Sequence, residues 1–206
     1  MKNMKKQMVL LVLTILGTVH VMAQNEVQNK LSEADAAFKS GNLEETRFAL
    51  QQSLAALDKL VGEAILNKLP AELSGLEAET EDDEMSGGSA GLTGVYVKRY
   101  YMGDEQDIEL EIVTNSPFMS MVNASLTNPL LASMSGGDQS VVKIDGYKSL
   151  LRKNENSDGV PSFELNIPVN DSMIIINSNG FTQNEVINIA NAIDVRGIAK
   201  LIGASQ

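Results

Sequence analysis

The chain has 206 residues, a net charge of −11 and no cysteine. So acidic a protein is disfavoured as a nucleic-acid binder, because binding to phosphates needs a lysine- and arginine-rich surface. The one histidine, His20, lies near the N-terminus. The rest of the chain therefore lacks Ser-His-Asp and Cys-His catalytic arrangements, and its zinc ligands are reduced to carboxylates. We expect neither a metal nor a cofactor.

The first 23 residues have the features of a secretory signal peptide. Three lysines within the first six residues precede the apolar core MVLLVLTILG (8–17), and Val21-Met22-Ala23 resembles a cleavage site. The apolar core is too short to favour a membrane anchor. We expect residues 1–23 to be removed and the mature protein to be exported. The Ala-Gln cleavage site favours the periplasm of a Gram-negative bacterium, and release outside the cell stays open.

Residues 24–68 predict a helical hairpin. Apolar residues recur three or four positions apart, as an amphipathic helix requires. Gly41, within Lys39-Ser40-Gly41-Asn42, marks the end of the first helix. The apolar positions are Leu31, Ala34, Phe38, Leu43, Phe48, Leu50, Leu54, Leu57, Val61, Ile65 and Leu66. This apolar face has two uses that stay open: packing on the next domain, or dimerisation with a second hairpin.

Residues 69–92 differ in composition from the hairpin. Leu69-Pro70 stops the helix. Six acidic residues follow between Glu77 and Glu84, and glycine, serine and alanine come after them. This composition is typical of a solvated linker between domains. A calcium-attracting acidic loop is the alternative interpretation.

Residues 93–206 predict an α+β domain. Asn170-Asp171 suits a two-residue turn, which places Ile167 opposite Ile174 and Leu165 opposite Ile176. The whole chain is thus predicted as a helical hairpin followed by an antiparallel sheet of about five strands, with helices packed on one face. Alternation of apolar and polar residues indicates these strands at 94–101, 107–114, 141–152, 163–169 and 172–177.

The C-terminal residues predict two short helices. Thr182 and Glu185 have the spacing of a capping box, and Phe181 and Val186 have the spacing of a hydrophobic staple. Asp194 is expected to begin the second helix. Both helices are expected to cover the sheet with their apolar sides.

The uncharged stretch 114–134, TNSPFMSMVNASLTNPLLASM, predicts a helix interrupted by proline. Ser116-Pro117 is typical of a helix start, and Asn128-Pro129 ends the helix before a further turn at PLLASM. The stretch is too broken and too polar on one side to span a membrane. Four residues on one helix face are candidates for a ligand groove: Phe118, Met121, Val122 and Leu126. They either fill a closed core against the sheet or line a groove that opens to an apolar ligand.

This stretch also carries a family resemblance. Preceded by VKRYYMGDEQDIELEIV and followed by KIDGYKSLL, it resembles a family of exported bacterial proteins of uncharacterised function that share an SP-helix-NP-helix pattern between strands. The likeness covers roughly residues 69–201 and implies no catalytic residues. The final hairpin, capped helix and Ile193-Asp194 are also similar to small PsbP-like and LolA-like sheets, which bind partners or lipids.

Together these features predict a non-enzymatic exported protein that serves as an envelope accessory or binding module, with an apolar ligand or an envelope protein as its partner. The alternative is a self-associating structural protein that dimerises through the helical hairpin. A hydrolase that uses carboxylates such as Asp104, Glu105 and Glu109 comes third. It ranks below the others because strand alternation places these acids on a solvated face, and aromatic residues make up 4% of the chain.

Overall fold

The computed structural model describes residues 25–87, 94–128, 138–155 and 159–203. The predicted signal peptide, the end of the predicted linker and the turn predicted at PLLASM lie outside these residues. The described chain divides into two compact units, and the boundary falls inside one helix, between Leu60 and Val61. No helix among the described residues is both long and apolar enough to cross a membrane.

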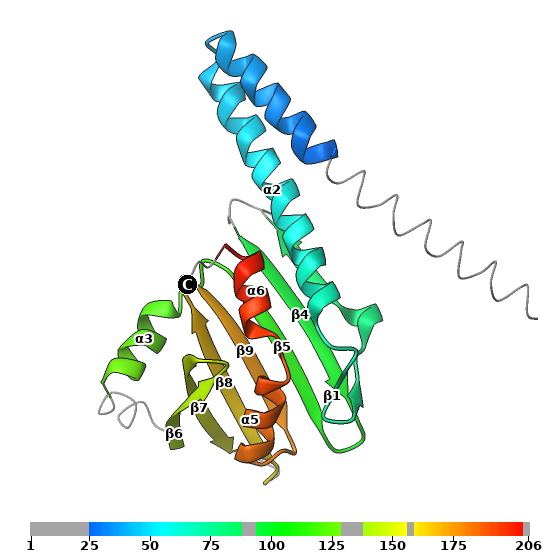
Figure 1. Ribbon diagram of the computed structural model, residues 1–206, viewed down its shortest axis with the longest axis vertical. Helices are drawn as coiled ribbons and strands as arrows, with labels where there is room; N and C mark the ends of the chain where they lie inside the picture. The colour runs from blue at the N-terminus through cyan, green and yellow to red at the C-terminus, as the bar shows by residue number, and fades with distance from the viewer. Residues whose placement is uncertain (1–24, 88–93, 129–137, 156–158, 204–206) are drawn as a thin grey trace, which may run out of the picture. The chain divides into compact units, whose positions relative to one another are not determined.

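The first unit contains the predicted helical hairpin. A helix at residues 25–39 is followed by α2 (Leu43–Lys68) (Figure 1). Gly41 has a φ of 80°, and the N–H of Asn42 donates to the carbonyl of Ala37 at 3.0 Å, which is the Schellman ending that glycine favours. The Asn42 side chain then accepts the N–H of Glu45 at 3.1 Å and caps α2. The helix break predicted at 39–42 is therefore confirmed.

Small side chains fill the contact between the two helices of the hairpin. Ala34 and Ala37 on the first helix are buried, as are three small residues on α2, which are Ala49, Ser53 and Ala56. The Ser53 hydroxyl donates to the carbonyl of Val27 at 3.5 Å, so the helices run antiparallel. The larger apolar residues of the predicted amphipathic pattern are exposed instead: Leu31, Phe38, Leu43, Phe48, Leu50, Leu54 and Leu57.

The second unit is built on a seven-stranded sheet with the strand order β3-β4-β5-β9-β8-β7-β6. Every neighbouring pair from β4 to β6 in this order is antiparallel. A separate two-stranded sheet pairs β1 (Glu72–Leu73) with β2 (Leu76–Glu77). The strands of the main sheet are β3 (Glu84–Gly87), β4 (Val95–Met102), β5 (Asp107–Val113), β6 (Asp138–Ile144), β7 (Tyr147–Glu155), β8 (Pro161–Val169) and β9 (Ser172–Asn179).

The α+β class is confirmed, and the sheet has two more strands than expected. One extra strand arises because residues 141–152 form parts of two strands: Asp145 and Gly146 have φ values of 46° and 96° and make a hairpin turn between β6 and β7. The other is β3, which comes from the acidic segment. The β8–β9 register is as predicted, since Ile167 pairs with Ile174 and Leu165 with Ile176 around a turn in which Asn170 has a φ of 56°.

One face of the sheet carries the hydrophobic core of this unit. Strand β5 alternates as predicted, with Ile108, Leu110 and Ile112 fully buried. Helices α5 (Gln183–Asn191) and α6 (Val195–Leu201) cover this face and lie in front of the sheet in Figure 1. The core also takes Ile65 and Leu69 from the end of α2 and just beyond it, together with Phe181, Val186, Ile189, Ile193 and Ile198.

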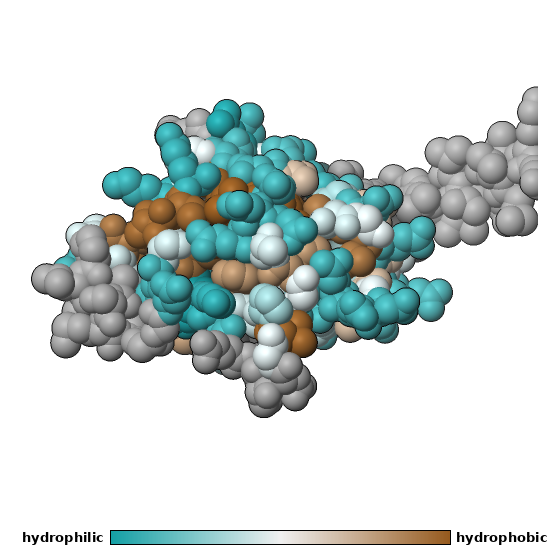
Figure 2. Space-filling model, turned by 90° about the horizontal axis from the view of Figure 1, so that it is seen from below, coloured by the Kyte–Doolittle hydropathy of each residue, from teal (hydrophilic) through white to brown (hydrophobic). Residues whose placement is uncertain are grey.

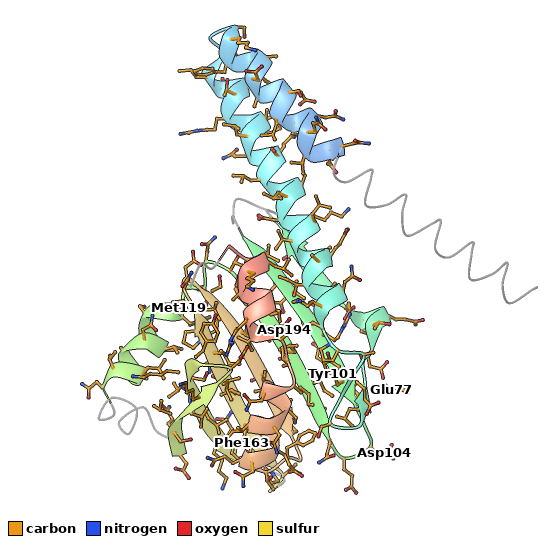
Figure 3. The ribbon with its side chains drawn as sticks, in the orientation of Figure 1. Glu77, Tyr101, Asp104, Met119, Phe163 and Asp194 are labelled. Atoms are coloured by element: carbon orange, nitrogen blue, oxygen red, sulfur yellow. The ribbon has the colours of Figure 1, made fainter. Side chains whose placement is uncertain are left out.

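Both C-terminal helices begin as the sequence predicts. The Thr182 hydroxyl accepts the N–H of Glu185 at 3.4 Å, and the Glu185 carboxylate accepts the N–H of Thr182 at 2.7 Å, which completes the capping box. Asp194 caps α6 by accepting the N–H of Gly197 at 2.8 Å, and it also pairs with Lys68 at 2.9 Å. Asp194 is labelled in Figure 3.

The acidic segment that we interpreted as a linker forms local structure. Residues 72–86 contain β1, β2, a short 3₁₀ turn (Thr80–Asp82) and most of β3, and they belong to the sheet unit. Asp83 accepts the Nε–H of Arg99 at 2.8 Å, and both side chains are largely buried. Arg99 also donates to the carbonyls of Leu66 and Leu69 at the end of α2, at 3.1 and 3.5 Å. One buried guanidinium thus holds the acidic segment and the end of α2 to β4.

A second buried group, Tyr101, makes a similar connection. Its hydroxyl donates to the carbonyl of Pro70 at 2.9 Å, and burial raises its pKa to about 12, so the phenol stays protonated. Figure 3 labels Tyr101 on β4. These β4 side chains thus attach the segment after α2 to the sheet, in addition to the pairing of β1 with β2 within that segment.

Candidate functional site

The second face of the sheet carries a continuous row of polar side chains. Pairing across the central strands places Glu109 of β5 beside Asn177 of β9, and Asn177 beside Glu164 of β8. The row continues from Glu164 to Arg152 of β7 and from Glu109 to Tyr100 of β4. Side chains in a strand alternate between faces, so these residues lie opposite the apolar core. The sheet is therefore apolar on one face and polar on the other.

Helix α3 (Met119–Thr127) covers part of this polar face. It begins two residues later than the sequence predicted, at Met119 and not at Pro117, because residues 116–118 form a turn in which the Ser116 hydroxyl accepts the N–H of Phe118 at 3.4 Å. It ends as predicted, with Asn128 at its C-terminus. Figure 3 labels Met119 at the start of the helix.

The helices were expected on one face only, whereas α3 lies on the face opposite α5 and α6. The reason is a second, small hydrophobic cluster formed by Val122, Leu150 and Met173. Leu150 and Met173 each neighbour a core residue in sequence, Leu151 and Ile174, and therefore point to the other face. Leu150 and Met173, which lie on the otherwise polar face, thus form the apolar surface on which α3 packs.

A pocket of about 300 Å³ lies beneath α3. Phe118, Met121 and Val122 of the α3 segment line it together with Ile175 of β9. Its other lining residues are polar and belong to the sheet: Glu111, Arg152, Glu164, Asn166 and Asn177. The volume is at the lower end of the range for small-molecule sites, which is roughly 300–1,000 Å³.

The four residues predicted from the sequence for a groove have two different roles. Val122 is buried in the small cluster, and Leu126 packs against that cluster without lining the pocket. Phe118 and Met121 line the pocket and remain 59% and 57% exposed. Val122 thus belongs both to the cluster and to the pocket lining, whereas Leu126 belongs to the cluster alone and Phe118 and Met121 to the pocket lining alone. That the pocket takes a ligand stays a prediction.

One lysine serves two carboxylates beside this pocket. The ammonium of Lys98 lies 3.1 Å from Glu109 and 3.6 Å from Glu111. Burial alone lowers the pKa of Lys98, but the hydrogen bond to Glu109 and the other groups around it outweigh that effect and raise the pKa. Lys98 also lies over the ring of Tyr100, 5.4 Å from its centre. The cation is thus held firmly in place.

The pKa values of the two carboxyl groups are shifted in opposite directions. Burial raises the pKa of Glu111, and the neighbouring Glu109 raises it further. For Glu109 burial also acts to raise the pKa, but hydrogen bonds, including those from Asn177 at 2.9 Å and from Lys98, lower it overall. Glu111, which lines the pocket, is therefore the carboxyl whose negative charge is compensated less well.

A second ion pair closes the other side of the pocket. The guanidinium of Arg152 lies 3.7 Å from Glu164, and the side-chain amide of Asn166 donates to Glu164 at 2.6 Å. Arg152 is thus already paired within the protein. Around the pocket, three carboxylates (Glu109, Glu111 and Glu164) face two cations (Lys98 and Arg152), so its polar side carries a net negative charge.

The structure separates the carboxylates that the sequence suggested for hydrolysis. Asp104 and Glu105 line another hollow, of about 960 Å³, with Leu76, Gly103 and Gln106, whereas Glu109 lies in the middle of β5. Within the described residues, no group of three or more acidic or histidine side chains is arranged to hold a metal ion. The described part of the acidic segment therefore offers no calcium site of that kind.

Six pocket residues were not identified as candidates from the sequence: Glu111, Arg152, Glu164, Asn166, Ile175 and Asn177. The signal was available in the predicted β8–β9 register, which places Asn166 beside Ile175 and Glu164 beside Asn177. The position of α3 over that face was the missing information, because it depends on tertiary packing.

Comparisons with known proteins add little to this geometry. No protein-family model and no curated protein matches the chain. Among solved structures, the chain is similar to the extracellular domain of PknH from Mycobacterium tuberculosis, with 15% sequence identity and a TM-score of 0.34. That match covers 52% of this chain and 63% of the PknH domain.

Proposed function

We propose that this protein is an exported, non-enzymatic binding module that takes a small amphiphilic ligand beneath α3. The observation that carries the proposal is the pocket itself, which joins an apolar side to a polar, net negative side. The proposed ligand has a short apolar group and a cationic or hydrogen-bond-donating head. The signal-like N-terminus supports a site of action in the bacterial envelope, most simply the periplasm.

The apolar group of the ligand would bind against α3. Phe118 and Met121 are large and exposed in an otherwise acidic protein, and Figure 2 shows a surface in which hydrophilic side chains predominate, with hydrophobic residues visible among them. Covering Phe118 and Met121 with an apolar ligand removes their surface from water, which is favourable by about 25 cal/mol per Å². Methionine is also flexible enough to adapt to different ligand shapes.

The head group would bind against the sheet. Glu111 shares the single ammonium of Lys98 with Glu109, so a ligand cation beside Glu111 supplies the missing positive charge. The side chains of Asn166 and Asn177 also line this part of the pocket. An anionic head group, such as the carboxylate of a fatty acid, would face Glu111 and Glu164 and is disfavoured.

Catalysis has little support in this arrangement. Apart from His20 the sequence has no histidine, and it has no cysteine, so the usual nucleophile–base pairs are lacking. Glu109 and Glu111 are both tied to Lys98, and Glu164 is tied to Arg152 and Asn166. Each of these carboxylates is thus already engaged by a cation of the protein, which supports a role in recognition over a role as general acid, base or nucleophile.

Calorimetric titration with octylamine and octanoate tests the proposal, because the two probes share a chain and differ in head-group charge. We expect octylamine to bind more tightly by at least about tenfold, or ~1.4 kcal/mol. Phe118→Ser should weaken octylamine binding, whereas Phe48→Ser, which removes another exposed phenylalanine in the hairpin, should leave it unchanged. Glu111→Gln should reduce the preference for octylamine over octanoate without abolishing binding of the alkyl chain that both probes share.

Three outcomes contradict the proposal. If neither probe binds, the pocket is only a packing space beneath α3. If octanoate binds as tightly as octylamine, the head-group assignment is wrong. Turnover of chromogenic glycosides or esters that is lost in Glu111→Gln would contradict the non-enzymatic part.

A further inference from the structure

The helical hairpin buries its small residues and exposes its large apolar ones. Alanines and Ser53 form the contact between its helices, while Phe38 is 64% exposed and Leu43 is 68% exposed. Burying a leucine or phenylalanine is worth roughly 1.5–3 kcal/mol, so several such side chains left in water are unusual for an isolated hairpin. The exposed residues therefore point to a binding partner.

Most of these side chains lie on one side of the hairpin. On α2, Leu50, Leu54 and Leu57 follow one another at spacings of four and three, which makes a single stripe. At 3.6 residues per turn this stripe is rotated by roughly 100° from the buried Ala49 and Ala56. The stripe of Leu31 and Phe38 on the first helix is rotated from the buried Ala34 and Ala37 in the same sense, by roughly 80°.

Equal rotation in antiparallel helices places the two stripes on the same side of the hairpin. We call the combined surface the hairpin face; its residues are Leu31, Phe38, Leu43, Leu50, Leu54 and Leu57. Phe48 is rotated the opposite way and lies outside it. The hairpin thus has one broad apolar side that neither of its own helices covers.

The spacing within the hairpin face indicates a helical partner. Leu31 and Phe38 are seven residues apart, as are Leu43, Leu50 and Leu57. A seven-residue apolar repeat keeps one seam facing a neighbouring helix along its length. The part of α2 in this unit, residues 43–60, is about 27 Å long, which is enough for several layers of such contacts.

The area of the hairpin face suits a dimer of modest size. Six half-exposed leucine and phenylalanine side chains offer on the order of 100 Å² each. A stable interface buries about 800 Å² per partner, so these six side chains supply most of it and their neighbours along the helices supply the remainder. Two hairpins packed through this face form a four-helix bundle with a leucine-rich core.

Charge favours a second copy over a lipid surface. Residues 25–60 contain six acidic and four basic residues, so the hairpin is nearly neutral although the whole chain carries −11. Two hairpins therefore approach each other with little repulsion. Helices that lie on anionic membranes usually have a lysine- and arginine-rich polar side, which this hairpin lacks.

We propose that the hairpin face binds the same face of a second copy of this chain, so that the protein is a dimer held by a four-helix bundle. The dimer surface shares no residue with the pocket beneath α3. Either proposal can therefore fail without the other.

Sedimentation equilibrium of the exported protein, over a wide concentration range, tests the dimer. We expect the mass of a dimer for the wild type. Leu54→Glu should raise the dissociation constant by at least about a hundredfold, because it places a charge inside the apolar contact. Phe48→Glu is the matched control, an equally drastic change on the other side of the same helix, and it should leave the dimer intact.

Single cysteines provide a second test that does not depend on a disruptive charge. The chain has no cysteine, so Leu50→Cys, Leu54→Cys or Leu57→Cys can form a disulfide only with another copy. We expect oxidation to give covalent dimers from at least one of these variants and not from Phe48→Cys. Cross-linking that is equally strong from Phe48→Cys would overturn the proposal, since association would then use another surface.

Two other results would overturn it as well. A wild-type protein that stays monomeric at every concentration excludes the second copy as the partner. This holds whether the cysteine of Leu54→Cys then reacts with a thiol reagent or is protected by another part of the same chain. Binding to phosphatidylglycerol vesicles that Leu54→Glu abolishes, without any dimer in solution, would identify a membrane as the occupant.

Discussion

The hairpin and the sheet unit arrange the same kinds of residue in opposite ways. In the sheet unit, Ile108, Leu110 and Ile112 are fully buried, and charged residues occupy the other face. In the hairpin, Ala49 and Ala56 are inside, and leucines of similar size to those of the sheet are outside. The comparison teaches that apolar periodicity identifies a helix face without saying what covers it. In the sheet unit, α5 and α6 cover the apolar face, whereas in the hairpin no described element of the unit covers the exposed leucines.

Matched leucine truncations should show the largest difference between the two units. Leu110 is 0% exposed and Leu54 is 50% exposed. Leu110→Ala should lower the free energy of unfolding by about 4 kcal/mol, because it leaves a cavity in the core. At a concentration where the protein is monomeric, Leu54→Ala should cost less than about 1 kcal/mol. Urea unfolding measures both, and equal losses would mean that the hairpin face is already buried in the monomer.

Matched carboxylate deletions compare a buried ion pair with an exposed one. Asp83→Ala should cost about 3 kcal/mol, because Arg99 stays buried with only the carbonyls of Leu66 and Leu69 as partners. Asp35→Ala removes an exposed partner of Lys39 and should cost less than about 0.5 kcal/mol. Thermal and urea unfolding measure the two losses. A small effect of Asp83→Ala would show that the acidic segment is held by other contacts.

Matched glycine substitutions separate backbone strain from crowding. Gly41 in the hairpin and Gly180 in the sheet unit have φ values of 80° and 79°. Alanine at either position should cost about 1 kcal/mol for the left-handed backbone. At position 180 the added methyl group would also lie 2.5 Å from the carbonyl oxygen of Glu105, whereas nothing lies within 4 Å of it at position 41. Gly180→Ala should therefore cost at least about 2 kcal/mol in urea unfolding, and equal costs would exclude crowding.

The smallest expected effect is on the pH dependence of stability, through the carboxyl group of Glu111 in the sheet unit. The folded protein raises the pKa of Glu111 above its ordinary value of 4.5, so the folded state holds this proton more tightly than the unfolded chain. Glu111 thus makes stability fall as pH rises through the range just above 4.5. Glu111→Gln should remove that part of the pH profile measured by urea unfolding at a series of pH values.

Glu109→Gln should change the profile in the opposite sense. The pKa of Glu109 is lowered, so its ionised form stabilises the protein above the ordinary pKa and this stability is lost as pH falls. The variant should therefore be less stable at neutral pH and lose less on acidification. If both variants change the profile in the same direction, the assignment of the two carboxyls around Lys98 is wrong.

Local sequence patterns predicted most of the fold. The break at Gly41, the Thr182–Glu185 capping box and the Asn170 turn each depend on a few neighbouring residues, and each is present in the structure. The Asp145–Gly146 turn has the same kind of signal, but residues 141–152 were predicted as one strand. Such features are predictable because the backbone conformation they need is restricted to a few residue types.

The candidate site could be predicted only in part. The alternation of β5 placed Glu109 opposite the core, as the structure has it. Phe118 and Met121 line the pocket, and their role in binding a ligand stays a prediction. Whether those two side chains meet Glu111 depends on which face of the sheet α3 covers, and that follows from Val122 meeting Leu150 and Met173. Contacts between residues so far apart in the sequence leave no local pattern.

The position of Arg99 also has a consequence for the order in which structure is lost. Its guanidinium holds the carbonyls of Leu66 and Leu69, 33 and 30 residues earlier in the chain, and it can do so only while β4 is in place. In hydrogen–deuterium exchange, amides near the end of α2 should therefore exchange at the rate of β4 and more slowly than amides near Gly41. The boundary of cooperative opening would then lie within a single continuous helix and not at its ends.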